Sequence, residues 1–311
     1  MIAAVACLGV VVSGSAGADE VTCGTAHAAL GPYRHVVWIW MENHPYDEII
    51  GAPQSRFVDR LAADCGLATN YHNVGHPSLP NYIAATSGGT QSISDDCQPS
   101  ECSRPAQSLF GQLQAAGLSW RAYEESMPSA CDLRSGSGGN PRGDYAPKHN
   151  PAVYYLPLRP GCRQRVVPLG VPSAGPLARA LATRSLPRFS FITPNLCNDT
   201  HDCPVSTGDA WLARWVHAIV ASPVYRTQRT VIFITWDEGE GGHTNDCALD
   251  TSDPGCHVAT LVVSPTTPRG TRAAQLFNHY ALLKTTEQLL GIEQLLGRAR
   301  TSRSMRAAFH L

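Results

Sequence analysis

Continuous apolar runs alternate along the chain with stretches in which apolar residues recur at helical spacing. The apolar runs predict strands at 35–40, 120–123, 188–193, 230–236 and 257–264. The helical spacing predicts helices at 55–65, 81–86, 106–116, 177–183, 209–221 and 279–290. Because the strands are apolar throughout and alternate with helices, we expect an α/β fold: a mostly parallel central sheet with helices on both faces.

The segment 125–173 interrupts this alternation. It is rich in Gly, Pro, Ser and Arg and has little periodicity. We expect a long surface excursion that is either a linker or a functional lid. The chain has no internal repeat and no clear domain boundary, so residues 19–311 are expected to form a single domain.

The N-terminus is typical of an exported protein. Residues 1–12 are almost wholly apolar, and Ala16-Gly17-Ala18 fits a small-residue cleavage pattern. We therefore expect a signal peptide at 1–18, although no Lys or Arg precedes the apolar run. The other interpretation is a frayed apolar tail. The run is too short to predict a stable membrane span.

Composition excludes some partners. The 311 residues are 43% hydrophobic and 16% charged, which is enough to form a sizeable core. With a formal net charge of −1, the chain has no basic surplus for nucleic acid or for an anionic membrane surface.

The cysteine count agrees with export. Of eleven cysteines, Cys7 would leave with the signal peptide, and the remaining ten allow at most five disulfides. The expected pairs are Cys197 with Cys203, Cys247 with Cys256, and Cys97 with Cys131. The chain contains no C-x-x-C pair, which argues against zinc held by thiolates.

Two polar pairs, Glu42-Asn43 and Asp237-Glu238, each follow an apolar strand directly. Neighbouring side chains on a strand point to opposite faces, so both members of a pair reach one site only where the strand has ended and the chain bends. Three carboxylates in one place repel one another unless a cation neutralises them. An all-oxygen ligand set favours Ca²⁺, Mg²⁺ or Mn²⁺ over zinc. The other interpretation is that these are ordinary polar strand ends.

Ser78 lies where the helix at 81–86 is expected to begin. Backbone N–H groups and the positive end of the helix dipole at such a point suit a phosphate. A cation bound to the serine oxygen would lower the hydroxyl pKa and make Ser78 a nucleophile. The alternative is a serine that only caps the helix.

Two further features are ambiguous when taken alone. The polar run 194–202, followed by Gly208-Asp209, is either a site loop closed by the pairing of Cys197 with Cys203 or a solvated turn. His279 begins the last helix and would by itself be an ordinary capping residue.

Five segments in order share the pattern of one known family. They are MENHPYDEIIG at 41–51, HPSLPNYIAATSG at 76–88, PNLCNDTHD at 194–202 with GDAWL at 208–212, TWDEG at 235–239, and NHYALLKTTEQLLG at 278–291. Together they resemble the bacterial phosphoesterase family of secreted acid phosphatases and phospholipases C, part of the alkaline phosphatase superfamily. The resemblance covers about residues 34–292.

The resemblance implies a role for each candidate residue. Those implied as metal ligands are Glu42, Asn43, Ser78, Asp237 and Glu238. Those implied as catalytic are Ser78, His149, His201 and His279, with Ser78 attacking phosphorus and His201 the first choice to protonate the leaving alcohol. Those implied in substrate binding are Asn81, Lys148 and Asp202, and the alternative role of Asp202 is to orient a histidine. One divalent metal ion is expected, since Asp237-Glu238 replaces an Asp-His pair used elsewhere in the superfamily. His257 resembles a histidine present only in some members.

The implied activity is that of a secreted, metal-dependent acid phosphatase that hydrolyses phosphomonoesters through a phosphoserine intermediate. Phospholipases C of the family are usually longer than this chain, which resembles the short acid phosphatase branch. A phospholipase C that acts on phospholipid head groups is the alternative, and a catalytically inactive phosphate-ester-binding protein is a third possibility. The expected partner is a small-molecule or lipid phosphoester.

Overall fold

The computed structural model describes residues 21, 23–25, 32–136, 143–240, 246–247 and 251–311. The predicted signal peptide at 1–18 lies outside these residues. Within the described part of the chain, no helix has the length and apolar character needed to cross a membrane.

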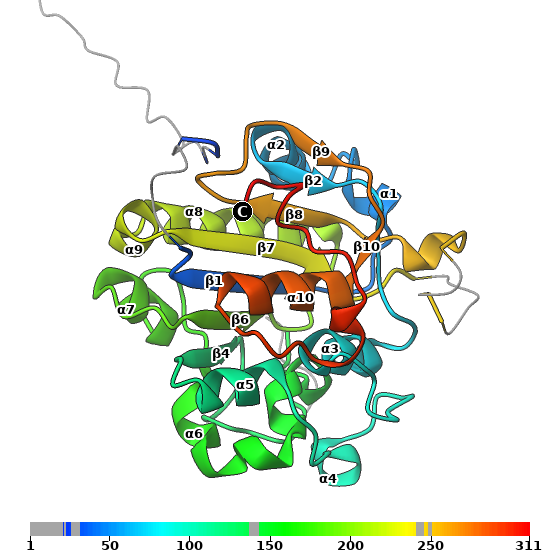
Figure 1. Ribbon diagram of the computed structural model, residues 1–311, viewed down its shortest axis with the longest axis vertical. Coiled ribbons are helices and arrows are strands. Elements are labelled where there is room, and N and C mark those ends of the chain that lie inside the picture. Colours follow the sequence, from blue (N-terminus) through cyan, green and yellow to red (C-terminus); the bar gives the residue numbers. More distant parts are fainter. Residues whose placement is uncertain (1–20, 22, 26–31, 137–142, 241–245, 248–250) are drawn as a thin grey trace, which may run out of the picture.

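A central sheet of eight strands, in the order β5-β4-β6-β1-β7-β8-β2-β9, runs through the molecule (Figure 1), and β3 and β10 form a small second sheet. The strands are β1 His35–Met41, β2 Gly66–Ala68, β3 Tyr71–His72, β4 Trp120–Glu124, β5 Val166–Pro168, β6 Phe189–Thr193, β7 Thr230–Trp236, β8 Thr260–Val263, β9 Thr271–Ala273 and β10 Phe277–Asn278. From β5 to β7 all neighbours are parallel, whereas β8 is antiparallel to both β7 and β2. The prediction of a mostly parallel sheet is confirmed, with one antiparallel strand near an edge.

Helices cover both faces of the sheet. The α-helices are α1 Tyr46–Ile49, α2 Arg56–Asp64, α3 Ser78–Ser87, α4 Pro99–Cys102, α5 Leu109–Ala115, α6 Cys162–Arg165, α7 Pro176–Ala182, α8 Val205–Ala221, α9 Pro223–Thr227 and α10 His279–Leu289. Short 3₁₀ helices are η2 Pro147–His149, η3 Pro151–Tyr154, η4 Leu156–Gly161, η5 Pro254–Cys256 and η6 Gly297–Arg300. In Figure 1, α10, α3 and α5 lie on one face, and α8 with its neighbours α2 and α9 lies on the other.

The two central strands, β1 and β7, are buried along their whole length. A sheet covered on both faces requires strands that are apolar throughout, and for this reason the runs at 35–40 and 230–236 could be predicted as strands from the sequence. The predicted strand at 257–264 is shorter in the structure, because His257 is held in a turn by a hydrogen bond from its N–H to Pro254 O.

The excursion at 125–173 is more ordered than its composition predicts. Its described residues, 125–136 and 143–173, contain the 3₁₀ helices η2, η3 and η4, α6 and the edge strand β5, which pairs with β4. The short elements follow one another too closely to leave a periodic signal. The excursion returns to the sheet edge and is therefore neither a linker nor a featureless loop.

Five disulfides join the ten cysteines that remain after Cys7 is set aside. They are Cys23–Cys65, Cys97–Cys102, Cys131–Cys162, Cys197–Cys203 and Cys247–Cys256. The last two pairs were predicted correctly, but the predicted pair Cys97 with Cys131 is wrong. Cys97 meets Cys102 across the single turn of α4, and the fold of the excursion brings Cys131 to Cys162 beside β5.

Glu287 on α10 is a fully buried carboxyl whose Oε1 accepts a hydrogen bond from Leu296 N at 2.9 Å. Burial raises its pKa from 4.5 to about 7. The fold therefore favours the protonated form, and the free energy of unfolding falls as pH rises from 4.5 toward 7 and is level above that. We expect Glu287→Gln, which keeps an acceptor for Leu296, to stabilise the protein by about 1–2 kcal/mol at pH 8 and not at pH 4. Urea unfolding at the two pH values measures this, with the exposed Glu293→Gln as control. An equal gain at both pH values would contradict it.

Candidate active site

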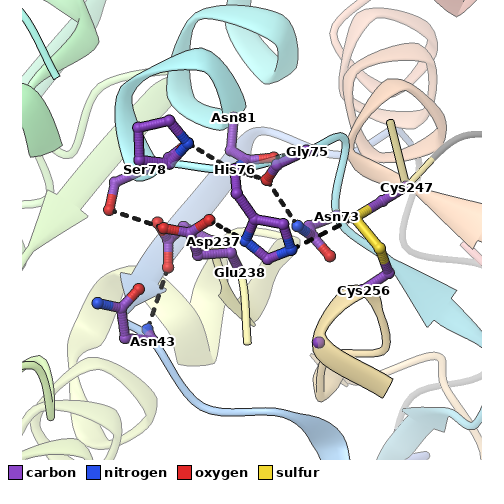
Figure 2. A network of polar contacts seen from close by, with 12 residues as sticks. Asn43, Asn73, Gly75, His76, Ser78, Asn81, Asp237, Glu238, Cys247 and Cys256 are labelled. Atoms are coloured by element: carbon purple, nitrogen blue, oxygen red, sulfur yellow. Dashed lines mark hydrogen bonds and ion pairs between the residues drawn. A yellow bond between two sulfur atoms is a disulfide. The ribbon is translucent and has the colours of Figure 1, made fainter. Parts of the chain in front are cut away.

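The two strand-end pairs meet at one edge of the sheet. Strands β1 and β7 run in parallel register, with Met41 opposite Trp236, so the next residues, Glu42 and Asp237, emerge side by side. Asp237 N donates to Met41 O at 3.0 Å. Asn43 takes the left-handed conformation, with φ of 53°, which asparagine tolerates well. Its backbone N–H then donates to Asp237 Oδ1 at 3.2 Å (Figure 2).

Ser78 is the first residue of α3 and is buried between two of these carboxylates. Its Oγ lies 3.1 Å from Glu42 Oε2 and 3.2 Å from Glu238 Oε1, in hydrogen-bond geometry to each. The helix includes the predicted residues 81–86 but begins three residues earlier, at Ser78. One of its first N–H groups is already engaged, because Leu79 N donates to Asp96 Oδ1 at 2.9 Å.

The carboxyls around Ser78 are withdrawn from water. Burial, and then the neighbouring Asp237 and Asp199, raise the pKa of Glu42 well above its usual value. Burial and the adjacent Glu238 do the same to the pKa of Asp237. Burial is also the main cause of the raised pKa of Asp199. Four acidic side chains therefore share one buried region, where charge is costly without a compensating cation.

The donor set fits a hard divalent cation. Glu42, Asp237 and Glu238 present carboxylate oxygens, and Asn43 and Ser78 lie beside them. Asp237 Oδ2 is buried without a hydrogen-bond partner, as expected of an atom whose partner is an ion. Oxygen donors of this kind suit Mg²⁺, Ca²⁺ or Mn²⁺.

His149 lies between two acidic residues. Its Nε2 is 3.1 Å from Glu42 Oε1, its Nδ1 is 3.3 Å from Asp199 Oδ2, and its ring stacks on Tyr82 at 5.4 Å. Burial, followed by the charge of Lys148, lowers the pKa of His149 well below its usual value. Burial thus favours the neutral imidazole, which lies between the two carboxyls although its Nε2 and Asp199 Oδ2 have no hydrogen-bond partner.

His201 has the exposure that a proton donor needs. Its side chain is 28% exposed, and its Nδ1 is held 2.7 Å from Asp202 Oδ1. The backbone N–H of His201 donates to Asp199, and its ring centroid is 6.1 Å from that of His149. Asp202 therefore contacts His201, and its role in orienting a catalytic histidine stays a prediction.

Two other candidates use their polar groups to support the site. His279 is fully buried, with Nδ1 3.0 Å from the Tyr71 hydroxyl and Nε2 2.7 Å from Asp237 O, and burial lowers its pKa to about 4. Asn81 accepts from Val74 N and Gly75 N and donates to Gly75 O and Pro77 O. The proposed contact of Asn81 with phosphate and the catalytic role of His279 stay predictions.

Lys148 lies at the wall of a cavity of about 530 Å³ that is also lined by Asp96 and Asp202. Its ammonium is 2.8 Å from Asp96 Oδ2. Burial alone would lower the pKa of Lys148, but the charges of Glu42 and Asp96 outweigh it and the pKa is raised. Because the lysine stays protonated near the buried carboxyls, it can attract a phosphate group to them.

We expect Lys148→Met to raise KM for a phosphomonoester, and the inhibition constant of inorganic phosphate, by roughly 10- to 100-fold, as for loss of one charge-assisted contact. Steady-state kinetics with inorganic phosphate as inhibitor measure both. Lys284→Met is the matched control, since Lys284 bonds backbone carbonyls of Arg300 and Ser302. Unchanged phosphate inhibition in the Lys148 variant would contradict the assignment.

The structure adds residues that the motifs did not single out. Tyr82 donates its hydroxyl hydrogen to Glu42 Oε1, and His76 Nδ1 lies 2.5 Å from Glu238 Oε2. Asp96 accepts a hydrogen bond from Leu79 N, and Asp199 lies beside His149. Tyr82 and His76 lie in the segment 76–88 together with Ser78, and this position is the sequence feature that could have placed them in the site. Asp96 lies outside all five segments, so no sequence feature indicated its place in the site. His257 stacks on Tyr46 at 4.3 Å.

Comparison with known proteins identifies the class. The family model described as Phosphoesterase family matches residues 52–293, most of the chain. A phosphatidylinositol-3-phosphatase of Mycobacterium tuberculosis is 32% identical over 86% of this chain and 81% of its own length. An acid phosphatase of Aspergillus fumigatus is 26% identical over 83% of this chain, and this chain spans only 55% of that protein.

Solved structures show the same fold. A Vibrio parahaemolyticus protein of the alkaline phosphatase superfamily superposes with a TM-score of 0.59 at 14% identity, over 93% of this chain and 78% of that one. The fold is thus that of this alkaline phosphatase superfamily protein, and the family match and the phosphatase relatives identify the chain as a phosphoric ester hydrolase. The chain belongs to the phosphoesterase family. The family match begins at residue 52 and does not include Glu42 and Asn43. These two residues are placed in the site because β1 ends beside the end of β7.

Proposed function

We propose that this protein is a metal-dependent acid phosphatase in which Ser78 attacks phosphomonoesters. The observation that carries the proposal is the position of Ser78 Oγ at a helix N-terminus, 3.1 and 3.2 Å from two buried carboxylates. Such a hydroxyl has acceptors for its proton and lies beside an oxygen-rich cluster that fits a divalent ion, in which Asp237 Oδ2 has no hydrogen-bond partner. A purely structural serine would not need several buried acidic groups around it.

The metal ligands are proposed to be Glu42, Asn43, Ser78, Asp237 and Glu238. A divalent ion held by them would lower the pKa of the serine hydroxyl and offset negative charge on the phosphoryl oxygens. Lys148 would draw the phosphate group toward Ser78.

The chemical steps are assigned to residues of this chain. Ser78 Oγ forms the bond to phosphorus in line with the leaving oxygen, and its proton passes to a contacting carboxylate. His201, oriented by Asp202, donates a proton to the leaving alcohol as the phosphorus–oxygen bond breaks. His201 then accepts a proton from the water that attacks the phosphoserine, the bond between Ser78 Oγ and phosphorus breaks, and the carboxyl returns its proton to Ser78 Oγ as inorganic phosphate leaves.

The relatives favour monoesters. The M. tuberculosis and A. fumigatus proteins are both named as phosphatases, and the former acts on a lipid phosphate by its name. We therefore propose phosphomonoesters, lipid-derived ones included, as substrates. Export is part of the proposal: the five disulfides and the apolar residues 1–12 are typical of proteins in an oxidising compartment.

The test compares hydrolysis of p-nitrophenyl phosphate with that of p-nitrophenylphosphorylcholine, with and without EDTA, using protein that begins at Asp19. The proposal predicts chelator-sensitive release from the first substrate. Preference for the second would assign a phospholipase C with the same residues. Inactivity on both with metal bound would favour a phosphate-ester-binding protein.

A further inference from the structure

His76 joins the Glu238 carboxylate to a disulfide. Its Nδ1 lies 2.5 Å from Glu238 Oε2, and its Nε2 lies 3.7 Å from Cys247 Sγ (Figure 2). The side chain of His76 is 19% exposed and that of Glu238 is 7% exposed, so the contact is shielded from bulk water. No sequence motif assigns His76 a function.

The disulfide itself is fixed to the two segments that carry the site. Cys247 N donates to Val74 O, and Asn73 N donates to Cys256 O, each at 3.0 Å. Gly239 N donates to Gly255 O at 2.9 Å. Cys247 and Cys256 are both fully buried. The disulfide joins Cys247 to Cys256, and backbone hydrogen bonds hold these two cysteines against the loop before Ser78 and beside the turn after Asp237-Glu238.

The two oxygens of Glu238 have different partners. Oε2 is occupied by His76, whereas Oε1 faces Ser78 Oγ at 3.2 Å. A carboxylate with one oxygen held in this way presents the other in a fixed orientation, and supports of this kind commonly tune the affinity of metal ligands.

The same three side chains could be taken for a metal site. Within the described residues, ligand atoms of His76, Cys247 and Cys256 all lie within 4.8 Å of one another. The two sulfurs are bonded to each other, however, so neither is a thiolate, and thiolates are what a zinc site of this composition requires. The imidazole is left with Glu238 as its polar partner.

We propose that His76, held in place by the Cys247–Cys256 disulfide, is a positioning residue that aims Glu238 Oε1 at Ser78 and at the metal. The inference rests on the proposed function, because it takes Glu238 as a metal ligand. It adds a role for His76 and a reason for the disulfide beside the site.

Four variants test this. His76→Asn places an amide N–H near the position of Nδ1 and keeps a donor for Glu238, whereas His76→Gln places its amide one carbon further out, and His76→Ala removes the donor. Cys247→Ser with Cys256→Ser removes the support. Removal of the distant disulfide, by Cys131→Ser with Cys162→Ser, is the matched control.

The readouts are the Kd of Mn²⁺, Mg²⁺ and Ca²⁺ by titration calorimetry, kcat and KM for p-nitrophenyl phosphate, and the thermal unfolding temperature. We expect His76→Ala, His76→Gln and the Cys247/Cys256 variant to weaken metal binding by about 10- to 100-fold. Their kcat should fall by more than their KM rises. His76→Asn should retain most of the affinity, and the control should match the wild type in Kd.

The outcomes distinguish a failure of the positioning role of His76 from a failure of the proposed function. Unchanged metal affinity in His76→Ala, or equal affinity in His76→Asn and His76→Gln, overturns the positioning role. If His76→Ala does not fold, the Asn and Gln pair decides. If the wild type neither binds the three ions nor hydrolyses the ester, the proposed function fails first and the inference fails with it.

Discussion

Replacing Ser78 with alanine is expected to reduce phosphomonoester turnover by about 10³- to 10⁶-fold, the range seen when a catalytic nucleophile is removed. Ser78 is buried at the start of α3, and its Oγ contacts two carboxylates at 3.1 and 3.2 Å, so alanine removes the hydroxyl that is placed to attack phosphorus. The loss should be in kcat. Single-turnover and steady-state assays, together with unfolding curves, separate lost chemistry from lost folding.

Ser87→Ala is the matched control for this experiment. Ser87 is the last residue of the same helix, and its Oγ bonds backbone carbonyls of Ile83 and Gly89. It should cost some stability but leave turnover within a few-fold of the wild type. A folded Ser78→Ala protein that keeps wild-type turnover would contradict the role of Ser78 as nucleophile.

Replacing Asp237 with asparagine should weaken divalent metal binding by roughly 100-fold or more and abolish most activity, yet stabilise the metal-free protein. Burial, and then Glu238, raise the pKa of Asp237, so its ionisation opposes folding as pH rises above the unfolded value. Asparagine removes that cost and keeps an oxygen for Asn43 N. We expect a gain of roughly 1–3 kcal/mol at pH 7 and little gain below pH 4.

Calorimetric metal titration and urea unfolding in EDTA measure the two opposite effects of Asp237→Asn. Asp209→Asn provides the contrast, because Asp209 binds the N–H groups of Phe57 and Val58 at the start of α2. It should lose stability and keep metal affinity. A metal-free Asp237→Asn protein that is less stable than the wild type at pH 7 would contradict the account of the buried acidic groups.

The central strands could be predicted because they are buried on both faces, and the long helices because each buries one apolar stripe. The run 230–236 is a strand over the same residues in the structure, and the helix at 279–290 differs by one residue. The short strands β2, β3, β9 and β10 could not be predicted, since each has only two or three residues and is defined by its partner. The predicted partner of Cys97 was wrong because the single turn of α4 brings Cys102, five residues along the chain, next to Cys97.

The sequence motifs placed Glu42, Ser78 and Asp237 correctly in one region, because the ends of parallel strands meet at one edge. They could not show what each side chain contacts. Asn81 binds the loop before Ser78, and His279 binds Asp237 O, whereas the resemblance implies a substrate-binding role for Asn81 and a catalytic role for His279. Contacts of this kind depend on the path of the backbone between motifs.

Acid-quenching the wild-type protein during turnover of a phosphomonoester, followed by mass spectrometry of its peptides, tests the central claim most directly. The account predicts a phosphoryl group on Ser78, absent from Ser78→Ala and from protein treated with EDTA before substrate is added. A phosphoryl group on another residue, or full turnover with no labelled Ser78 at any quench time, would contradict it.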